Sequence, residues 1–167
     1  MQAKYPPQAH NASVYPDLLL ALDALLAGER DMIANLANCS ALLFNQLPGL
    51  NWAGFYLWRS NELVLGPFQG KPACIRIAKG RGVCGQAAQS RRTLIVADVH
   101  TFADHIACDA DSQSEIVVPL MAGDRLLGVL DLDSPFIGRF NETDAAGLEA
   151  VAAKLIAATD FHLNQND

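Results

Sequence analysis

The segment from Glu115 to Asp133 constrains the fold more than any other part of this 167-residue chain. It contains two apolar runs, 115–121 and 125–133, which are separated by the short segment 122–124. Two runs rich in Val, Ile and Leu around a tight turn containing glycine are typical of a β-hairpin. We therefore expect these runs to be paired strands in the centre of a sheet.

Strand alternation places Asp131 and Asp133 on one face and Leu130 and Leu132 on the other. If the acidic face is shielded from water, one carboxyl acquires a raised pKa and can donate a proton near neutral pH. Glu115 begins the neighbouring strand and could join the pair. The alternative is a solvent-facing edge on which both acids are simply hydrated.

Helical periodicity begins after Asp17, a plausible N-cap, and is interrupted at Gly28 before it resumes as far as Pro48. It predicts two helices or one kinked helix. A last helix should follow a cap at Asn141. Between these helices, β-rich segments predict a meander with the strands 52–58, 62–66, 72–77 and 93–97, and a helix-compatible segment at 86–90. The pattern indicates an α+β domain, with helices on one face of an antiparallel sheet and a loop-covered pocket on the other.

The bulk composition narrows the classes of function. The formal charge of -6 and pI near 5.0 argue against nucleic-acid binding, which needs clustered Lys and Arg. No apolar run approaches the roughly 20 residues of a membrane span, and no signal-peptide core is visible, so we expect a cytoplasmic protein with reduced thiols. One domain is expected at 17–160, with an N-terminal arm at 1–16 and a C-terminal tail at 161–167.

Cys39 and Cys84 have different predicted environments. Cys39 lies within the second apolar helical segment and should be a small buried hydrophobe without a chemical role. Cys84 follows Gly82 in what should be the first turn of a helix, where free amides and the helix dipole favour a thiolate. The same glycine-rich turn could instead hold a small anion, such as a substrate carboxylate.

Cys108 lies on a polar, irregular segment, 98–114, which is long enough to suggest a functional loop. Its neighbours Asp109 and Asp111 should raise the pKa of its thiol and slow simple thiolate attack. A carboxylic acid that protonates the oxygen of the electrophile would offset that disadvantage. A Cys-His hydrolase dyad with His100 or His105 is an alternative.

The cysteine spacings do not favour zinc. Ten positions separate Cys74 from Cys84, and 24 separate Cys84 from Cys108, so no C-x2-C pair occurs, although His105 lies three positions before Cys108. A thiol redox site explains the three cysteines better than a metal site does.

Several motifs resemble those of the free methionine-(R)-sulfoxide reductases, which are single GAF domains. The resemblance extends from about Tyr15 to Asp160. It depends on Gly80-Arg-Gly-Val-Cys-Gly85, Asp98-Val-His100, His105-Ile-Ala-Cys-Asp109, Ser114-Glu-Ile116 and Gly128-Val-Leu-Asp-Leu-Asp-Ser134.

The resemblance implies a redox role for three cysteines. Cys108 would attack the sulfur of free L-methionine-(R)-sulfoxide, Cys74 would be the preferred resolving cysteine, and Cys84 an alternative partner. Thioredoxin would then reduce the disulfide, without a metal or cofactor. The resemblance also implies a homodimer.

The resemblance also implies a substrate site. Glu115, Asp131 and Asp133 would bind the amino group and the sulfoxide oxygen, and Trp52 would pack against the S-methyl group. Glu115 and Asp133 are the acids expected to take part in catalysis.

The competing class is a non-catalytic GAF module that senses a small ligand or redox state. Its cysteines would be switches and its acids would bind a ligand. Such a sensor usually needs an output domain, and only 161–167 follow the last predicted helix, so we expect the enzyme.

Overall fold

The computed structural model describes residues 14–106 and 108–162. It contains a six-stranded antiparallel sheet with the order β3-β2-β1-β6-β5-β4. The strands are β1 (Trp52–Arg59), β2 (Glu62–Gly70), β3 (Arg76–Ala78), β4 (Leu94–Val96), β5 (Ser114–Ala122) and β6 (Arg125–Ser134). The helices are α1 (Val14–Leu26), α2 (Met32–Gln46), α3 (Gly82–Ser90) and α4 (Glu142–Ala158), with a short 3-10 helix at Val99–Thr101.

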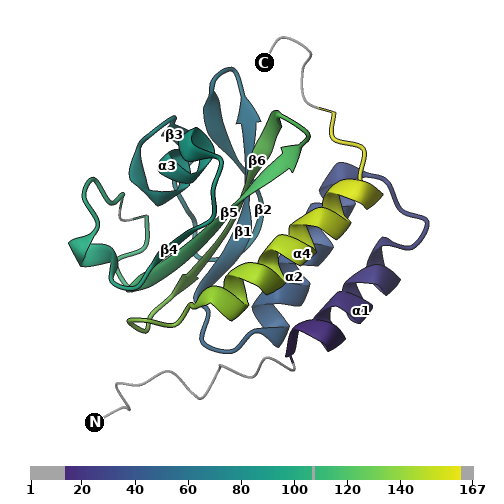
Figure 1. The fold of residues 1–167 in the computed structure, drawn as a ribbon, viewed down its shortest axis with the longest axis horizontal. Helices are drawn as coiled ribbons and strands as arrows, with labels where there is room; N and C mark the ends of the chain where they lie inside the picture. The colour runs from purple at the N-terminus through teal and green to yellow at the C-terminus, as the bar shows by residue number, and fades with distance from the viewer. Residues whose placement is uncertain (1–13, 107, 163–167) are drawn as a thin grey trace.

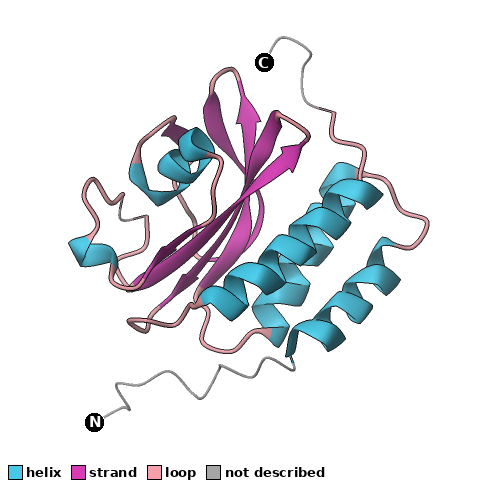
Figure 2. Cartoon of the chain, viewed as in Figure 1, coloured by secondary structure: helices cyan, strands magenta, loops and turns pink. Residues whose placement is uncertain are grey.

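The three long helices α1, α2 and α4 lie on one side of the sheet, and α3 lies on the other side with the loop that follows β4 (Figure 1). This arrangement confirms the predicted α+β architecture. Figure 2 shows the same division by secondary structure, with most of the loop on the α3 side. None of the helices in the described ranges has the length and apolar character that crossing a bilayer requires.

Each face of the sheet has its own apolar core, and the alternation along β6 separates them. Leu130 and Leu132 enter the core beneath the long helices. Val129 enters the second core, beneath α3. Asp131 and Asp133 therefore point to the α3 side, as the period of two predicts. Since β6 lies between β1 and β5, the alternative of a solvent-facing edge is wrong.

The first helix begins earlier than the sequence suggested. It starts at Val14, so Asp17 lies within its first turn and is not the N-cap. Pro16 is tolerated there because the first amides of a helix have no partner within the helix. Tyr15 packs against α4 at Gly147, where an added Cβ would lie 2.2 Å from the Tyr15 ring. Residues 1–13 of the predicted arm and 163–167 of the predicted tail lie outside the described residues.

Most of the other predicted helices and strands are confirmed, although several begin or end at other residues than predicted. Gly28, with a φ of +77°, separates α1 from α2, so two helices form, and Cys39 is fully buried in α2. Asn141 caps α4 through a reciprocal capping box with Asp144. The predicted strand 72–77 is wrong over most of its length, because only Arg76–Ala78 pairs in the sheet.

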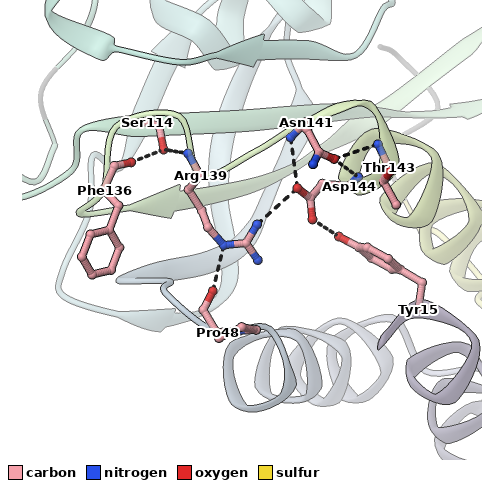
Figure 3. Close-up of polar contacts among 8 residues, drawn as sticks. All are labelled: Tyr15, Pro48, Ser114, Phe136, Arg139, Asn141, Thr143 and Asp144. Atoms are coloured by element: carbon pink, nitrogen blue, oxygen red, sulfur yellow. Dashed lines mark hydrogen bonds and ion pairs between the residues drawn. The ribbon is translucent and has the colours of Figure 1, made fainter. Parts of the chain in front are cut away.

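A buried polar network joins the helical layer to the end of β5 (Figure 3). Arg139 donates from Nε to the carbonyl of Pro48 at 2.8 Å and pairs with Asp144 at 3.2 Å, while the Tyr15 hydroxyl donates to the same carboxylate. The backbone amide of Arg139 also donates to the hydroxyl of Ser114, the first residue of β5. This network fixes the end of the strand that carries Glu115.

Candidate active site

A cavity opens on the α3 side of the sheet, between β1, β5, β6, α3 and the loop between β4 and β5. It brings together nearly all the residues that the sequence singled out. Its lining includes Trp52, Tyr56, Cys84, His105, Cys108, Glu115, Asp131 and Asp133, with Arg81, Gly82 and Val83 at the start of α3.

A disulfide closes one side of this cavity. It joins Cys74 to Cys108, which are 34 positions apart, with their Cα atoms 5.6 Å apart. Cys108 lies on the long loop, as predicted, and lines the cavity. Cys74 lies in the irregular segment before β3, where Tyr56 donates a hydrogen bond from its hydroxyl to the Cys74 carbonyl. The pair is the one that the family resemblance favours.

Polar contacts hold the Cys108 loop against the neighbouring segments, and we call the five residues that make them the loop clasp. Asn51 donates from Nδ2 to Asp109 at 3.2 Å and to Ser112 at 3.0 Å. Lys71 forms ion pairs with Asp109 and Asp111. The backbone amide of Asp111 and the charge of Lys71 hold the pKa of Asp109 below its usual value. The loop clasp therefore joins the segment before Cys74 to the segment after Cys108.

Three carboxyl groups lie in the interior of the cavity. Glu115 faces Asp133 across β5 and β6, and Asp131 is one pleat further along. Glu115 is only 6% exposed and Asp131 only 5%. Burial, followed by repulsion from a neighbouring acid, raises the pKa of all three well above the usual range. The cavity thus holds carboxyl groups that remain protonated at a higher pH than ordinary acids.

Cys84 lies in the first turn of α3, as predicted, but its expected activation is wrong. Its side chain is 4% exposed, and burial followed by the charges of Asp131 and Glu115 raises the pKa of its thiol well above normal. A helix N-terminus stabilises an anion by about 0.3–1 kcal/mol, whereas full burial can move a pKa by up to about 3–5 units. Burial therefore wins, and Cys84 is a thiol whose Sγ lies 3.8 Å from Oε1 of Glu115.

Trp52 forms an aromatic wall of the cavity. Its ring stacks on Phe68 with centroids 5.2 Å apart and lies near Tyr56 at 5.9 Å. Its indole Nε1 donates to the carbonyl of Lys71 at 3.2 Å, which fixes the ring plane. Trp52 also pairs in register with Asp133, so the ring and the carboxyl begin on adjacent strands at the same level.

No site role is expected for Tyr56 from the sequence, and His105 is a candidate there only as a hydrolase partner or a zinc ligand. His105 is instead largely buried, with Nε2 3.7 Å from Oε2 of Glu115, and burial lowers its pKa. Alternation along β1 could have identified Tyr56, because it lies on the same face as Trp52. No local signal could have placed His105 against a residue ten positions later.

One trio within the described residues has the spacing of potential metal ligands. The Sγ of Cys84 and one oxygen each of Glu115 and Asp131 lie within 4.8 Å of one another. With pKa values raised at all three groups, a cation would first have to displace protons from the trio. The expectation that no metal takes part in the reaction remains a prediction.

The GAF domain model matches residues 21–158, and the chain belongs to the GAF domain family. The Escherichia coli free methionine-R-sulfoxide reductase is 52% identical over 88% of this chain and 91% of its own. The Saccharomyces cerevisiae protein of the same name is 42% identical over 91% of this chain and 88% of its own.

A solved structure agrees with these relatives. The free methionine-R-sulfoxide reductase of Neisseria meningitidis, in complex with its substrate, superposes with a TM-score of 0.86 and is 46% identical, covering 95% of both chains. Within the GAF domains, this chain therefore belongs to the free methionine-R-sulfoxide reductase family, and the resemblance drawn from its motifs is confirmed.

Proposed function

We propose that this chain reduces free L-methionine-(R)-S-oxide to L-methionine, with Cys108 as the nucleophile. The observation that carries the proposal is the Cys74–Cys108 disulfide beside a cavity of buried carboxyl groups. A sulfoxide is a weak electrophile until its oxygen is protonated, so a carboxyl with a raised pKa supplies what a thiol alone lacks. The relatives named for this activity support the substrate.

The proposed substrate pose uses the different walls of the cavity. The S-methyl group packs on Trp52, and the sulfoxide oxygen accepts hydrogen bonds from Glu115 and Asp133 in their protonated forms. Asp131, when ionised, binds the amino group. The carboxylate lies near Arg81 and the first turn of α3, where backbone amides favour an anion.

Specificity for the free amino acid follows from this pose. Burying the ammonium and carboxylate groups of the substrate requires charged partners in the cavity. Methionine sulfoxide inside a polypeptide has amides at both positions and cannot make those contacts, and its chain continues where the cavity ends. A site built for such groups rejects an analogue that lacks them by several orders of magnitude.

The proposed reaction has two steps on the enzyme. The sulfur of Cys108 attacks the sulfoxide sulfur while a carboxyl protonates the oxygen, and the thiol proton of Cys108 replaces the proton that the carboxyl gave up. The hydroxyl group then passes to the Cys108 sulfur as the bonds from the substrate sulfur to oxygen and to Cys108 break, so methionine leaves and Cys108 becomes a sulfenic acid. The thiol of Cys74 then attacks the Cys108 sulfur, forming the disulfide and releasing water. The sulfoxide is reduced by two electrons, and the two thiols supply them.

We further propose that thioredoxin returns the disulfide to two thiols, that the reaction takes place in the cytoplasm, and that the protein works as a homodimer. A compartment that keeps thiols reduced is needed for repeated turnover. Cys84 is the less suitable resolving partner, because burial keeps it a thiol and its contact is with Glu115.

Steady-state NADPH consumption with thioredoxin and thioredoxin reductase tests the proposal. The substrates to compare are the free R epimer, the free S epimer, and the R epimer acetylated on nitrogen and amidated at the carboxyl group. We expect turnover of the free R epimer alone. A non-catalytic redox sensor would form its disulfide without sustained NADPH consumption, and that outcome would reject the enzyme.

A further inference from the structure

We propose that the exposed segment 71–76 is the docking surface for a dithiol protein reductant, that Ile75 is its apolar anchor, and that the reductant attacks Cys74. This proposal rests on the proposed function, because reduction of the sulfoxide is what forms the Cys74–Cys108 disulfide in each turnover. It adds the surface that the reductant recognises and the sulfur that it attacks.

The Ile75 side chain is exposed beside the disulfide. The exposed fraction is 70%, although Ile75 directly follows a cysteine of the disulfide. A single exposed apolar residue needs no explanation on its own, so its position is what matters. The Ile75 carbonyl accepts from the backbone amide of Leu65 at 2.9 Å, and the Cys74 carbonyl accepts from Tyr56. These bonds hold the backbone of the segment against the sheet while the Ile75 side chain remains in solvent.

The shape of the segment is the second observation. Residues 71–75 are irregular, and the chain first bonds to β2 through the Ile75 carbonyl before strand pairing begins at Arg76. Lys71, Pro72, Ile75 and Arg76 are exposed, and the residues between them are half-buried. A short, exposed, irregular strip beside a disulfide gives a partner protein access to the bond without unfolding any part of the sheet.

The two sulfurs differ in their surroundings, which is the third observation. Cys108 lines the substrate cavity, whereas Cys74 is not among the described residues that line it. Cys108 is followed by Asp109, whose lowered pKa keeps it ionised. Lys71 is shared between Asp109 and Asp111, so these three residues leave a net negative charge that a thiolate approaching Cys108 meets. Around Cys74 the neighbours are Ile75 and Arg76, and the charge of Arg76 is paired with Glu62. These neighbours add no net negative charge, so a thiolate approaches Cys74 with less repulsion.

One effect opposes this choice. A thiol with a lower pKa is the better leaving group, and the acids near Cys108 make its thiolate less stable. The opposition is weakened because Glu115 and Asp133 line the same cavity as Cys108 and retain protons to a raised pKa. A neutral carboxyl can protonate the departing sulfur, so access and approach decide which sulfur is attacked.

The exchange balances without any other reactant. The first thiolate of the reductant attacks Sγ of Cys74, a mixed disulfide forms, and Cys108 leaves and takes up a proton. The second thiol of the reductant then attacks the sulfur of the reductant's first cysteine in the mixed disulfide and releases Cys74 as a thiol. Two electrons pass to the protein, and the reductant leaves with a disulfide of its own.

The docking surface is tested by Ile75→Ser, with Ile33→Ser as the matched control. Ile33 is 54% exposed but lies on α2, on the opposite side of the sheet. With thioredoxin as the varied substrate, Ile75→Ser should lower kcat/KM by about 10-fold, as expected for an apolar anchor. Its rate with dithiothreitol should change by less than about twofold, and Ile33→Ser should change neither rate. Equal losses with both reductants, or no loss with thioredoxin, would overturn the proposal.

The attacked sulfur is identified by trapping. Thioredoxin whose second cysteine is replaced by serine is mixed with the oxidised protein, and the mixed disulfide is digested and mapped by mass spectrometry. The thioredoxin peptide should be joined to the Cys74 peptide, and its attachment to Cys108 would overturn the assignment. The trap starts from the disulfide and needs no sulfoxide, so its result is independent of whether free methionine sulfoxide is the substrate.

Discussion

The Sγ of Cys84 lies 3.8 Å from Oε1 of Glu115 and is directed at that carboxyl as a donor. Both side chains are buried, and the pKa of each is raised by that burial. A thiol with a raised pKa is a poor nucleophile towards a sulfenic acid. The contact instead suits Cys84 to hold Glu115 in place within the cavity.

We therefore expect Cys84→Ala to slow the single-turnover release of methionine by about 5-fold, as for the loss of one hydrogen bond of ~1 kcal/mol. The Cys74–Cys108 disulfide should still form completely, as peptide mapping would show. Cys74→Ser is the comparison, because it should leave a sulfenic acid on Cys108 that dimedone can trap. Trapped sulfenic acid in the Cys84 variant would mean that Cys84 is the resolving thiol.

A pH profile tests the role of Glu115 and Asp133 as proton donors. Because burial raises the pKa of both, the single-turnover rate should fall at a higher pH than for an ordinary acid, as the donor loses its proton. Glu115→Gln and Asp133→Asn should each lower the rate by about 10²-fold or more and remove part of that alkaline fall. Asp124→Asn, in the exposed turn after β5, is the control. Rates and profiles that match wild type in both cavity variants would contradict the role.

Asp131 should reduce stability at neutral pH. Its pKa is raised in the folded chain, mainly by burial and then by the charge of Glu115, so the folded state holds a proton that the unfolded state has lost. The free energy of unfolding should therefore fall as the pH rises from about 4 to the raised pKa, by up to ~1.4 kcal/mol per pH unit for each such group. Asp131→Asn should be more stable than wild type at pH 7 and show a shallower pH dependence in urea unfolding. A variant less stable at pH 7, with an unchanged slope, would show that Asp131 is not buried as an acid.

Lys71 tests the loop clasp. Its ion pairs to Asp109 and Asp111 join the segment before Cys74 to the Cys108 loop, so Lys71→Met should slow disulfide formation by about 2- to 5-fold, the modest effect of an exposed ion pair. The preceding burst of methionine should be unchanged, and Lys71→Arg should restore the rate. Lys79→Met removes another exposed lysine and serves as the control. A slower burst together with slower disulfide formation would point to general damage to the site.

Local patterns predicted the elements and several of the site residues. The alternation along 125–133 placed Asp131 and Asp133 on one face, and that face lines the cavity. The turn at 122–124, the cap at Asn141 and the buried Cys39 also depend on residues within one turn or one strand, so the sequence contained the information. The polar composition of 98–114 marked the loop that carries Cys108.

The features of the site that the sequence did not predict depend on contacts between distant segments of the chain. The helix dipole at Cys84 is a local property, but the burial that outweighs it is a product of tertiary packing. The acids that add to the effect of burial come from β5 and β6, more than 30 positions away. Lys71 meets Asp111 across 40 positions, and no local pattern relates the two residues. Tyr15, in the first turn of α1, likewise packs against Gly147 of α4, which is distant in the sequence.

Quantifying methionine after a single turnover is the most direct test of the central claim. The protein is reduced, freed of reductant, and mixed with excess free L-methionine-(R)-S-oxide. We predict about one methionine released per subunit, the loss of two thiols, and a Cys74–Cys108 disulfide in the digested protein. Cys74→Ser should release the same burst and Cys108→Ser none. A burst retained by Cys108→Ser, or no methionine from the wild-type protein, would contradict the account.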